Sequence, residues 1–581
     1  MAKKAAAKPA AAKPAALLRP QGFGGQATPR TTRKVLMLVG GPWHNGQEAG
    51  QVLAKLLAER KGRKLEVTSD LDALAALSGG KFSAVVIYTT GFTNDLTPAR
   101  EQGLVNFVKN GGAVVGVHSS AASFAGSRAY VDMMNGTFLT HPESFDVPVQ
   151  IIDRSHYLSA RLPDYTVPDE LYILKGFDPS RSTVLAQAWW QGKPMPMAYV
   201  HPYGAGRVAY LANGHDLRAW NHPEFQKLLV RALEWTTGAE LPAGRTIRCG
   251  LLGYGAGLQM GKGHAGWINA TPGLAAVAAC DILPERTEAA RKDFQDIETF
   301  RSLDEMLKMK DLDLVVNITP HHLHAALSIQ CLRSGRHVVS EKPFCLTTEE
   351  ATSILRTARR QKCMVSVFHN RRWDGDYVGI HDIIRRGLVG EVYHSESWCG
   401  RYGRPGLTWR SDKALSGGTL YDWGSHFIDW TLRLHNKRVT QVTGFLHKRL
   451  WHSVTVEDAA HAIIRFEGGA EAEHQQTFLA AIPRPKWRIL GTLGAIVGQW
   501  EAENLEVASY ASGVRFEGKV PAKPTYGCLD YYRNIADHLL MGEPLAVRPE
   551  QAREVIAVIE TAEHSSAIGH SLPLPAEVYE E

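Results

Sequence analysis

Two spacings of apolar residues alternate along the first part of the chain. Continuous β-branched runs at 35–39, 84–88 and 113–117 predict buried strands, and the helical spacing of apolar residues at 46–60 and 97–109 predicts helices. Strands that alternate with helices in this way pair in parallel, with helices covering both faces of the sheet. The pattern therefore predicts an α/β domain in this part of the chain.

The same alternation begins again after a break. Gly238, Pro242 and Gly244 mark residues 236–245 as a linker. Beyond it, apolar runs predict strands at 247–252, 275–280, 315–318, 338–339 and 364–368 and a helix at 324–332. Later runs such as 459–466 and 470–477 alternate as antiparallel strands with one buried face do. A second α/β domain followed by an α+β domain is therefore expected.

A glycine-rich turn follows the first strand of this second α/β domain. It reads Gly253-Tyr254-Gly255-Ala256-Gly257-Leu258, and its glycines allow close approach of a pyrophosphate to the next helix N-terminus. Asp281 ends the next strand and is the acid expected to bind the ribose hydroxyls. The interval to Asp281 exceeds the usual spacing of about 20 residues, so we expect a loop insertion at 259–263. Asp281 favours NAD over NADP because a carboxylate repels a 2′-phosphate, while Arg286 moderates that preference.

Lys342 lies at the end of a central strand of this domain. Residues 315–344 predict a strand, a helix and a strand, and a crossover of this length joins parallel strands. Glu341-Lys342-Pro343 therefore emerges at the sheet edge where α/β proteins bind ligands. The residues and their order resemble the Gfo/Idh/MocA family of nicotinamide-dependent sugar and cyclitol dehydrogenases, in which this triplet carries an active-site lysine. A lysine in an ordinary loop is the alternative for the triplet taken alone.

A second polar group of residues lies at 417–429. Asp422, His426 and Asp429 fall at i, i+4 and i+7, so they share one face if this segment is helical. Such a face is costly to bury unless it is used or fully paired. By the resemblance, Asp422 and His426 join Lys342 as the catalytic set, in which Lys342 or His426 takes the hydroxyl proton.

The resemblance covers about 246–574 and implies further contacts. Cofactor contacts are expected from the glycine turn, Asp281, Arg286, Thr319, Pro320, His324, Glu341, Lys342 and Pro343. Substrate contacts are expected from Asn370, Arg371, Trp409, Asp422 and His426. An aromatic face suits the apolar side of a sugar ring, and a core or interface position is the alternative for any single tryptophan.

The first α/β domain carries a different signature. Its third predicted strand ends in Gly116-Val117-His118-Ser119-Ser120, a turn that lifts one side chain above the strand end. In glutamine amidotransferases this turn presents a nucleophilic cysteine, but here His118 takes its place. All seven cysteines lie at or beyond Cys249, which excludes amidotransferase chemistry.

Further motifs make this domain resemble ThuA-like domains, which are similar to the class I amidotransferase fold with its catalytic residues replaced. They are Gly136-Thr137-Phe138, Asp169-Glu170-Leu171-Tyr172, residues 204–210 and Asn213-Gly214-His215-Asp216. His118, His141 and His215 can gather at the mouth of the sheet, as acid/base groups or as a metal site. A hydrogen-bonded structural role is the alternative for each histidine, and Asp169 and Glu170 can equally begin a helix or loop.

Together the patterns and resemblances predict an α/β protein with three folded domains. These are a ThuA-like, amidotransferase-type domain at 33–238, a Rossmann NAD(P)-binding domain at 246–368, and a C-terminal α+β domain on a largely antiparallel sheet at 369–581. Residues 1–32 repeat Ala, Lys and Pro, a composition that predicts a disordered tail.

Composition narrows the class of protein. The chain has 581 residues, 44% hydrophobic and 21% charged, and a net charge of +6. Much of this positive excess lies in the first 34 residues, so no folded surface is expected to bind nucleic acid specifically. The cysteines lack CxxC spacing, which favours a reducing compartment. The chain lacks an apolar run of membrane-span length and a secretion signal, so we expect a cytoplasmic protein.

Three functions fit these observations. The leading one is an NAD(P)-dependent oxidoreductase acting on a secondary hydroxyl of a sugar, glycoside or cyclitol, in a homo-oligomer, with the ThuA-like domain serving the same pathway. The second is redox-assisted glycoside cleavage with recycled NAD, in which oxidation acidifies a neighbouring C–H and His118 or His215 removes that proton. The third is a non-catalytic sensor of carbohydrate or dinucleotide. Intact Lys342, Asp422 and His426 argue against the sensor.

Overall fold

The computed structural model describes residues 34–58, 63–154, 156–238, 245–255, 259–522 and 527–579. The predicted tail at 1–32 lies outside the described residues. The chain divides into two compact units, Met1–Leu241 and Pro242–Glu581, and the division falls in the stretch predicted as a linker. Among the described helices, none combines the length and the apolar character needed to cross a bilayer.

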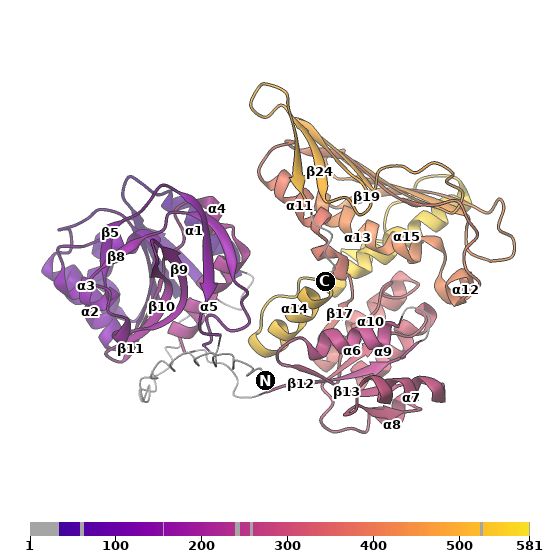
Figure 1. The fold of residues 1–581 in the computed structure, drawn as a ribbon, viewed down its shortest axis with the longest axis horizontal. Coiled ribbons are helices and arrows are strands. Elements are labelled where there is room, and N and C mark those ends of the chain that lie inside the picture. The colour runs from indigo at the N-terminus through magenta and orange to yellow at the C-terminus, as the bar shows by residue number, and fades with distance from the viewer. Residues whose placement is uncertain are drawn as a thin grey trace, which may run out of the picture. The chain divides into compact units, whose positions relative to one another are not determined.

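The first unit is built on a mixed nine-stranded sheet (Figure 1). Its order is β2-β1-β3-β4-β11-β10-β9-β6-β7. The parallel part comprises β1 (Lys34–Gly40), β2 (Lys64–Thr68), β3 (Ala84–Thr89), β4 (Ala113–Val117) and β11 (Gly206–Leu211). The antiparallel part comprises β6 (Phe145–Ile151), β7 (Tyr165–Asp169), β9 (Thr183–Trp190) and β10 (Lys193–Tyr203). Helices α1 (Gly46–Ala58), α2 (Pro98–Lys109) and α5 (Pro223–Thr236) pack on the parallel strands.

The turn after β4 sets up the first polar site. Every residue of β4 is buried, and His118 follows it with φ of 42°, in the left-handed region that non-glycine residues rarely adopt. A short 3₁₀ turn, η2 (His118–Ala122), continues from there. The predicted sharp turn is therefore present, and it holds His118 at the carboxyl end of the parallel strands.

The second unit begins with a six-stranded parallel sheet in the order β14-β13-β12-β15-β16-β17. Its strands are β12 (Ile247–Leu252), β13 (Leu274–Cys280), β14 (Glu298–Phe300), β15 (Leu314–Asn317), β16 (His337–Ser340) and β17 (Val365–Val367). Its helices include α6 (Met260–Asn269), α7 (Pro284–Asp293), α9 (His324–Arg333) and α10 (Thr348–Gln361). The strand order reverses direction at β12, so the carboxyl ends of β12 and β15 flank the crevice where such sheets bind dinucleotides.

The rest of the second unit is an eight-stranded sheet backed by helices (Figure 1). Its strands are β18 (Val392–Gly400), β19 (Val439–His447), β20 (Ala459–Phe466), β21 (Glu471–Thr477), β22 (Trp487–Gly491), β23 (Gly494–Gly498), β24 (Asn504–Ser509) and β25 (Phe516–Pro521). Only the β18–β21 pair is parallel. Its helices include α11 (Gly375–Arg385), α13 (Trp423–His435), α14 (Cys528–Met541) and α15 (Pro549–Ile568).

One hydrophobic core runs through both sheets of this unit. It includes Val315 and Val338 of the parallel sheet together with Ile428, Ile464 and Ile556 of the α+β part. Because the two parts share a core, side chains from both are held in fixed positions at the cleft between them. The predicted fold class, α/β with a largely antiparallel C-terminal sheet, is confirmed.

Two local expectations are wrong. The loop insertion expected at 259–263 is not found, because α6 begins at Met260. Gly261 is helical and packs on Tyr254, where an added Cβ would come within 2.7 Å of the ring, so this glycine serves close packing and not a loop. Asp422 does not lie within a helix with His426 and Asp429, since it is the N-cap of α13.

Candidate active site

A cavity of ≈ 1380 Å³ opens at the carboxyl ends of the parallel strands in the second unit, between the two sheets. The predicted residues that line it are Gly253, Gly255, Asp281, Arg286, Thr319, Pro320, His324, Glu341, Lys342, Asn370, Arg371, Trp409, Asp422 and His426. Tyr254 and Pro343 are absent from this lining. Ala256, Gly257 and Leu258 lie outside the described residues. Segments far apart in the sequence thus meet at one cavity.

Lys342 and Asp422 form an ion pair at the centre of this cavity. The Lys342 ammonium donates to Asp422 Oδ1 at 2.7 Å and to the Asp422 backbone oxygen at 3.0 Å. Burial alone would raise the pKa of the Asp422 carboxyl, but the Lys342 charge lowers it below its ordinary value. Asp422 is the N-cap of α13, where the chain turns, so its carboxylate oxygen and its backbone oxygen both face the Lys342 amine.

His426 lies one turn into α13 and faces the same cavity. Burial, reinforced by the positive charge of Lys342, lowers the pKa of His426 well below its ordinary value, so the ring is neutral near pH 7. Its Nδ1 is buried and lacks a hydrogen-bond partner among the described residues. A neutral imidazole with an open nitrogen is suited to accept a proton.

Asp429, which shares a helix face with His426, is used structurally. Arg372 donates to both of its oxygens, at 2.7 Å from Nε and 2.5 Å from Nη2, and the carboxylate is 1% exposed. This bidentate ion pair satisfies the buried charge. Asp429 is therefore occupied by Arg372, whereas Asp422 lines the cavity.

A chain of hydrogen bonds that sequence analysis missed holds the Lys342 backbone. Glu341 accepts the Lys342 amide at 2.9 Å and contacts His264 Nε2 at 3.0 Å, and His264 Nδ1 contacts the Tyr532 hydroxyl at 2.6 Å. His264 lies on α6, just beyond the stretch expected to be a loop, and its partners Glu341 and Tyr532 are distant in the chain. The network links three elements and fixes the segment that carries the lysine. The Lys342–Pro343 peptide bond is cis.

The glycine turn leaves space where a dinucleotide phosphate would approach. Gly253 has φ of +93°, and a Cβ there would lie 3.1 Å from the Ile318 carbonyl. A Cβ on Gly255 would meet no heavy atom within 4 Å, so this glycine borders open space. The turn is tight on one side and open on the other, which fits close approach of a pyrophosphate.

The far end of the cavity carries charges of both signs. Asp281 accepts the backbone amides of Tyr254 at 2.7 Å and Leu283 at 3.0 Å. Arg286 lies in the same lining, as does Arg301, a cation that sequence analysis missed. A carboxylate that receives two amides fits a ribose, and two guanidinium groups fit phosphate oxygens.

The remaining predicted residues differ in their surroundings. Asn370 donates to Cys528 Sγ at 3.2 Å, and the Arg371 guanidinium lies 5.1 Å from the Trp423 ring centre. Trp409 meets His321 edge to face with 4.7 Å between ring centres. His324 is fully buried, with Nδ1 2.7 Å from the Pro343 oxygen and Nε2 2.8 Å from the Thr319 oxygen. Its contacts secure the loops beside Lys342.

The Tyr254 ring points away from the cavity. Its hydroxyl donates to Asp293 at 2.9 Å, and the residue is 5% exposed. Only its backbone borders the turn, so its side chain has a structural contact where a cofactor contact was expected. Pro343 likewise contributes a backbone oxygen to His324.

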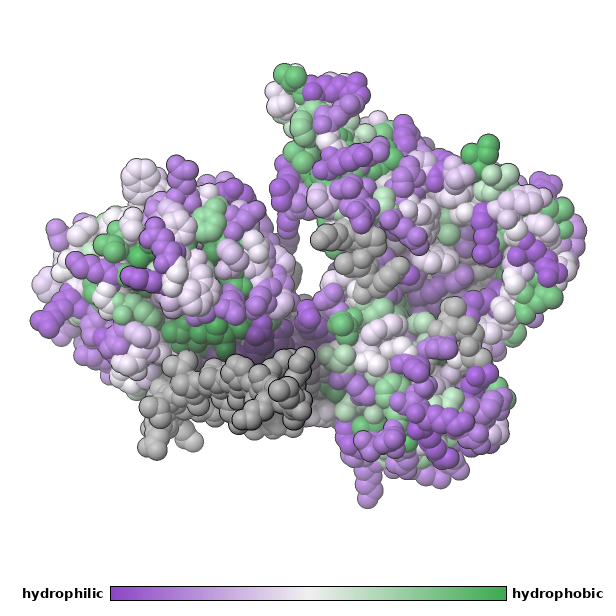
Figure 2. All heavy atoms as spheres, viewed as in Figure 1, coloured by the Kyte–Doolittle hydropathy of each residue, from purple (hydrophilic) through white to green (hydrophobic). Residues whose placement is uncertain are grey.

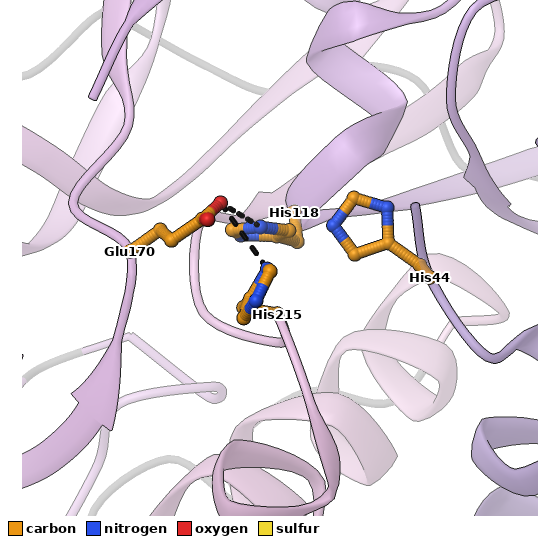
Figure 3. A group of neighbouring side chains, drawn as sticks. All are labelled: His44, His118, Glu170 and His215. Carbon is orange, nitrogen blue, oxygen red and sulfur yellow. Dashed lines mark ion pairs between the residues drawn. The ribbon is translucent and has the colours of Figure 1, made fainter. Parts of the chain in front are cut away.

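A second polar cluster lies in the first unit (Figure 3). Three histidines expected to gather there surround one carboxylate, Glu170 Oε2. The distances are 3.4 Å from His118 Nε2, 3.2 Å from His215 Nδ1 and 3.7 Å from His141 Nε2. Burial would raise the pKa of Glu170, but the imidazoles, His118 foremost, lower it below its ordinary value.

Two members of this cluster, His44 and Glu170, were not predicted as site residues. His44 joins His118, Glu170 and His215 in a group whose ligand atoms all lie within 4.8 Å of one another. It follows β1 in the stretch Gly40-Gly41-Pro42-Trp43, and a polar residue at that strand end was a usable signal. Burial, with the neighbouring imidazole charges, lowers the pKa of His44 to about 3, so the ring is neutral near pH 7.

Asp169 accepts hydrogen bonds from the backbone of the loops that carry the cluster. It is fully buried and accepts backbone amides from Glu170 at 2.8 Å, His215 at 3.0 Å and Gly214 at 2.8 Å. One carboxylate thus fixes the loops that carry Glu170 and His215. Asp169 therefore positions the loops, whereas Glu170, the next residue in the sequence, belongs to the cluster itself.

Family models match three consecutive segments of the chain. Residues 34–236 match the ThuA model, described as trehalose utilisation. Residues 247–369 match an oxidoreductase family with an NAD-binding Rossmann fold, and residues 377–497 match the GFO/IDH/MocA C-terminal domain. The segments correspond to the first unit and to the two parts of the second.

Individual proteins match parts of the chain. A scyllo-inositol 2-dehydrogenase (NADP(+)) from Bacillus subtilis is 30% identical over 345 residues, 55% of this chain and 94% of that protein. A glycosyl hydrolase family 109 protein from Shewanella pealeana is 29% identical over 169 residues, 28% of this chain and 36% of that protein. The crystal structure of an NAD-binding protein from Listeria innocua matches with a TM-score of 0.52 and 28% identity, covering 58% of this chain and 99% of that one.

The two oxidoreductase family models cover most of the residues that line the cavity described above. In this chain a ThuA domain precedes the two oxidoreductase domains. The chain therefore belongs to the Gfo/Idh/MocA family of NAD(P)-dependent oxidoreductases.

Proposed function

We propose that the second unit transfers hydride between a secondary hydroxyl of a sugar or cyclitol and the nicotinamide of NAD(P). One observation carries this proposal. The Lys342–Asp422 ion pair and the neutral His426 line a single cavity that also reaches the glycine turn. The Bacillus subtilis relative is named as a cyclitol dehydrogenase, which supports a polyhydroxylated ring as the substrate.

Bound NAD(P) would supply the hydride acceptor. The protein supplies the proton acceptor and the alignment of the hydroxyl. In the direction of oxidation, the Lys342 ammonium donates a hydrogen bond to the reacting oxygen and stabilises the negative charge that develops on it. His426 takes the hydroxyl proton, because its pKa is lowered and its ring is neutral near pH 7.

Asp422 positions the amine and the substrate. Its Oδ1 accepts from Lys342, and its second carboxylate oxygen can accept a neighbouring hydroxyl of the ring. A polyol with adjacent hydroxyls engages both groups, whereas a simple secondary alcohol engages one. We therefore expect kcat/KM to be higher for vicinal diols in a ring than for isolated alcohols.

The cofactor choice rests on opposing charges. Asp281 disfavours a 2′-phosphate, while Arg286 and Arg301 line the same end of the cavity and attract it. We propose that NAD is preferred and that NADP is also accepted. The Bacillus subtilis relative is named as an NADP(+) enzyme, and the ratio of kcat/KM with the two cofactors tests the preference in this chain.

The experiment is a panel of cyclitols, pyranoses and glycosides with NAD and with NADP, read at the nicotinamide absorbance. Cofactor reduction by at least one ring polyol, lost in Lys342→Met, supports the proposal. A panel without cofactor reduction and without ketone formation would contradict it.

A second candidate is redox-assisted glycoside cleavage, favoured by the cluster of imidazoles in the first unit. Hydride leaves a ring carbon two bonds from the anomeric centre, and the resulting ketone acidifies the C–H between them. A base such as His118 or His215 removes that proton, the electron pair forms the ring double bond, and the aglycone leaves. Water then adds and the hydride returns to the ketone. The Shewanella pealeana relative is named as a glycosyl hydrolase, which supports this candidate.

Cofactor turnover separates the two candidates. Simple oxidation accumulates reduced cofactor in step with ketone, whereas cleavage releases the aglycone with a catalytic amount of NAD and no net reduction. With a nitrophenyl glycoside, release by the wild type and its loss in His118→Ala would favour cleavage. A keto-glycoside that accumulates identically with both proteins would rule cleavage out.

We also propose that the chain self-associates. The hairpin of β24 and β25 projects from the sheet in Figure 1, and hydrophobic residues lie among hydrophilic ones at its tip in Figure 2. Tyr510, Val514 and Phe516 are 51%, 71% and 60% exposed there. Exposed apolar groups of this kind often mark protein contacts. Light scattering of the purified chain tests this, and a strictly monomeric mass would contradict it.

A further inference from the structure

The cluster of the first unit brings four possible ligand atoms together from four separate loops. His44 follows β1, His118 follows β4, Glu170 follows β7 and His215 follows β11. Three of these strands belong to the parallel part of the sheet and present their carboxyl ends at one edge. Figure 3 shows the side chains pointing toward a common centre.

The spacing of these atoms matches a metal coordination shell. Zn²⁺ bonds of about 2.0–2.1 Å to nitrogen and oxygen give a tetrahedron with an edge of about 3.3–3.4 Å. Glu170 Oε2 lies 3.4 Å from His118 Nε2 and 3.2 Å from His215 Nδ1. All four ligand atoms lie within 4.8 Å of one another, so small side-chain rotations would close the shell.

The ring nitrogens that face the centre have no hydrogen bond. His44 Nε2, His118 Nε2 and His215 Nδ1 are buried and lack a hydrogen-bond partner among the described residues. His118 itself is fully buried. Buried polar atoms normally have hydrogen-bond partners. Here His118 Nε2 and His215 Nδ1 have the Glu170 carboxylate as a close polar neighbour, and imidazole nitrogens arranged around one carboxylate suit a shared cation.

The opposite ring nitrogens are held by the protein. His118 Nδ1 lies 2.7 Å from the Ala212 oxygen, which makes it the N–H nitrogen and leaves a lone pair on Nε2. His44 Nδ1 lies 2.6 Å from the Thr90 hydroxyl. Metal-binding histidines are oriented by this kind of outer contact. The arrangement prepares both rings to coordinate through Nε2.

We propose that His44, His118, Glu170 and His215 bind one divalent transition-metal ion, with Zn²⁺ the best match. Three imidazoles and one carboxylate suit Zn²⁺, Co²⁺ or Ni²⁺, whereas Ca²⁺ and Mg²⁺ require oxygen ligands. The side chains of His215 and His141 are 27% and 34% exposed, so a small ligand can reach the ion from that side. A carbonyl or hydroxyl oxygen is the ligand class expected there. The site is independent of the proposed oxidoreductase activity, and in it His118 and His215 are metal ligands and not the free bases of the cleavage candidate.

Cobalt spectroscopy of the full chain tests this proposal. Metal-free protein, prepared with a chelator, is titrated with Co²⁺ and the visible absorption is recorded. The described cysteines all lie in the second unit and none occurs before Cys249 in the sequence. Saturable d–d bands at one ion per chain, without a thiolate charge-transfer band, are therefore expected. A thiolate band, or absorption that does not saturate, would overturn the proposal.

Variants then assign the ligands. Glu170→Gln keeps the shape of the side chain and His118→Asn removes an imidazole, and each should weaken Zn²⁺ binding by calorimetry at least tenfold. Thr90→Val removes the outer contact of His44 and should weaken binding by about 10- to 100-fold. His156→Ala, whose ring packs on Trp235, is the matched control and should bind normally.

Thermal unfolding covers the case in which a variant folds poorly. Zn²⁺ should raise the Tm of the wild type and of His156→Ala, and at the same concentration should raise the Tm of Glu170→Gln less. Equal Zn²⁺ affinity in Glu170→Gln and wild type would overturn the assignment. Binding of Ca²⁺ in preference to Zn²⁺ would do the same.

Discussion

Replacing Lys342 by methionine is the most informative single change in the second unit. Methionine keeps much of the length of the side chain and removes the ammonium that donates to Asp422 at 2.7 Å. The reacting oxygen then loses the donor that stabilises its developing charge. The Asp422 carboxylate also loses its counter-ion while it remains in the cavity wall.

This geometry predicts a change in kcat/KM and a change in the pKa of Asp422. Loss of an electrostatic donor and of correct positioning should lower kcat/KM about 10²- to 10⁴-fold, which corresponds to about 2.7–5.4 kcal/mol of transition-state stabilisation. The pKa of the Asp422 carboxyl should rise in the variant, because burial raises it and the Lys342 charge that lowers it is removed.

The assay compares wild type, Lys342→Met, Asp422→Asn and the double variant. Steady-state rates give kcat/KM, and NAD(P) affinity is measured separately by fluorescence. Cofactor affinity should change little if the lysine acts on the substrate oxygen. Lys308→Met, an exposed lysine outside the cavity, is the matched control and should behave like the wild type.

The double variant tests whether the pair acts as a unit. Asp422→Asn removes the charge that Lys342→Met leaves unpaired, so the double variant should be more stable to heat than Lys342→Met alone. Activity within about threefold of the wild type in Lys342→Met would refute the assigned role of the ammonium. Strictly additive effects of the two substitutions on Tm would refute their coupling.

Three further predictions concern pH, cofactor and stability. Since the pKa of His426 is lowered well below its ordinary value, the acid limb of the kcat/KM profile should fall well below pH 6.5, and a limb centred at or above pH 6.5 would contradict its role as base. Asp281→Asn keeps an acceptor for the Tyr254 amide but removes the charge, so the NADP-to-NAD ratio of kcat/KM should rise about tenfold; an unchanged ratio would assign the selectivity to Arg286 and Arg301. Asp458 accepts amides from Arg449 and Leu450, which together with Lys448 outweigh burial and lower its pKa from 3.8 to about 2. The stabilisation by the Asp458 carboxylate is present above pH 3.8 and is lost as the pH falls through about 2. Asp458→Asn should therefore lower Tm at neutral pH and match the wild type near pH 2. Equal Tm values at pH 7 would contradict this.

The parallel strands could be predicted because burial on both faces requires continuous apolar runs. β12 begins and ends where the pattern placed it, at Ile247 and Leu252. In contrast, β2 reads Lys-Leu-Glu-Val-Thr and is only partly buried, so its apolar content was too low to be recognised. The antiparallel strands β6 and β7 alternate buried and exposed residues but contain Pro148 and Pro168, and a proline within a run argues against a strand, so they were missed.

The candidate sites show the same division between local and distant information. Lys342, Asp422 and His426 carry recognisable local motifs, and the structure brings them to one cavity. Residues that act through distant contacts have no such signal. His264 supports Glu341 from 77 positions away in the chain, a contact created by the packing of α6. His44 reaches Thr90 across 46 positions, so its place in the cluster depends on the sheet order.

Deuterium transfer tests the central claim most directly. Ring-deuterated cyclitols and pyranosides are incubated with the full chain and NAD(P), and the recovered cofactor is examined by mass spectrometry for label at the nicotinamide ring. We predict that label accumulates on the reduced nicotinamide with the wild type and does so about 10²- to 10⁴-fold more slowly with Lys342→Met. Accumulation of ketone with the wild type, without label on the cofactor, would contradict hydride transfer in this cavity.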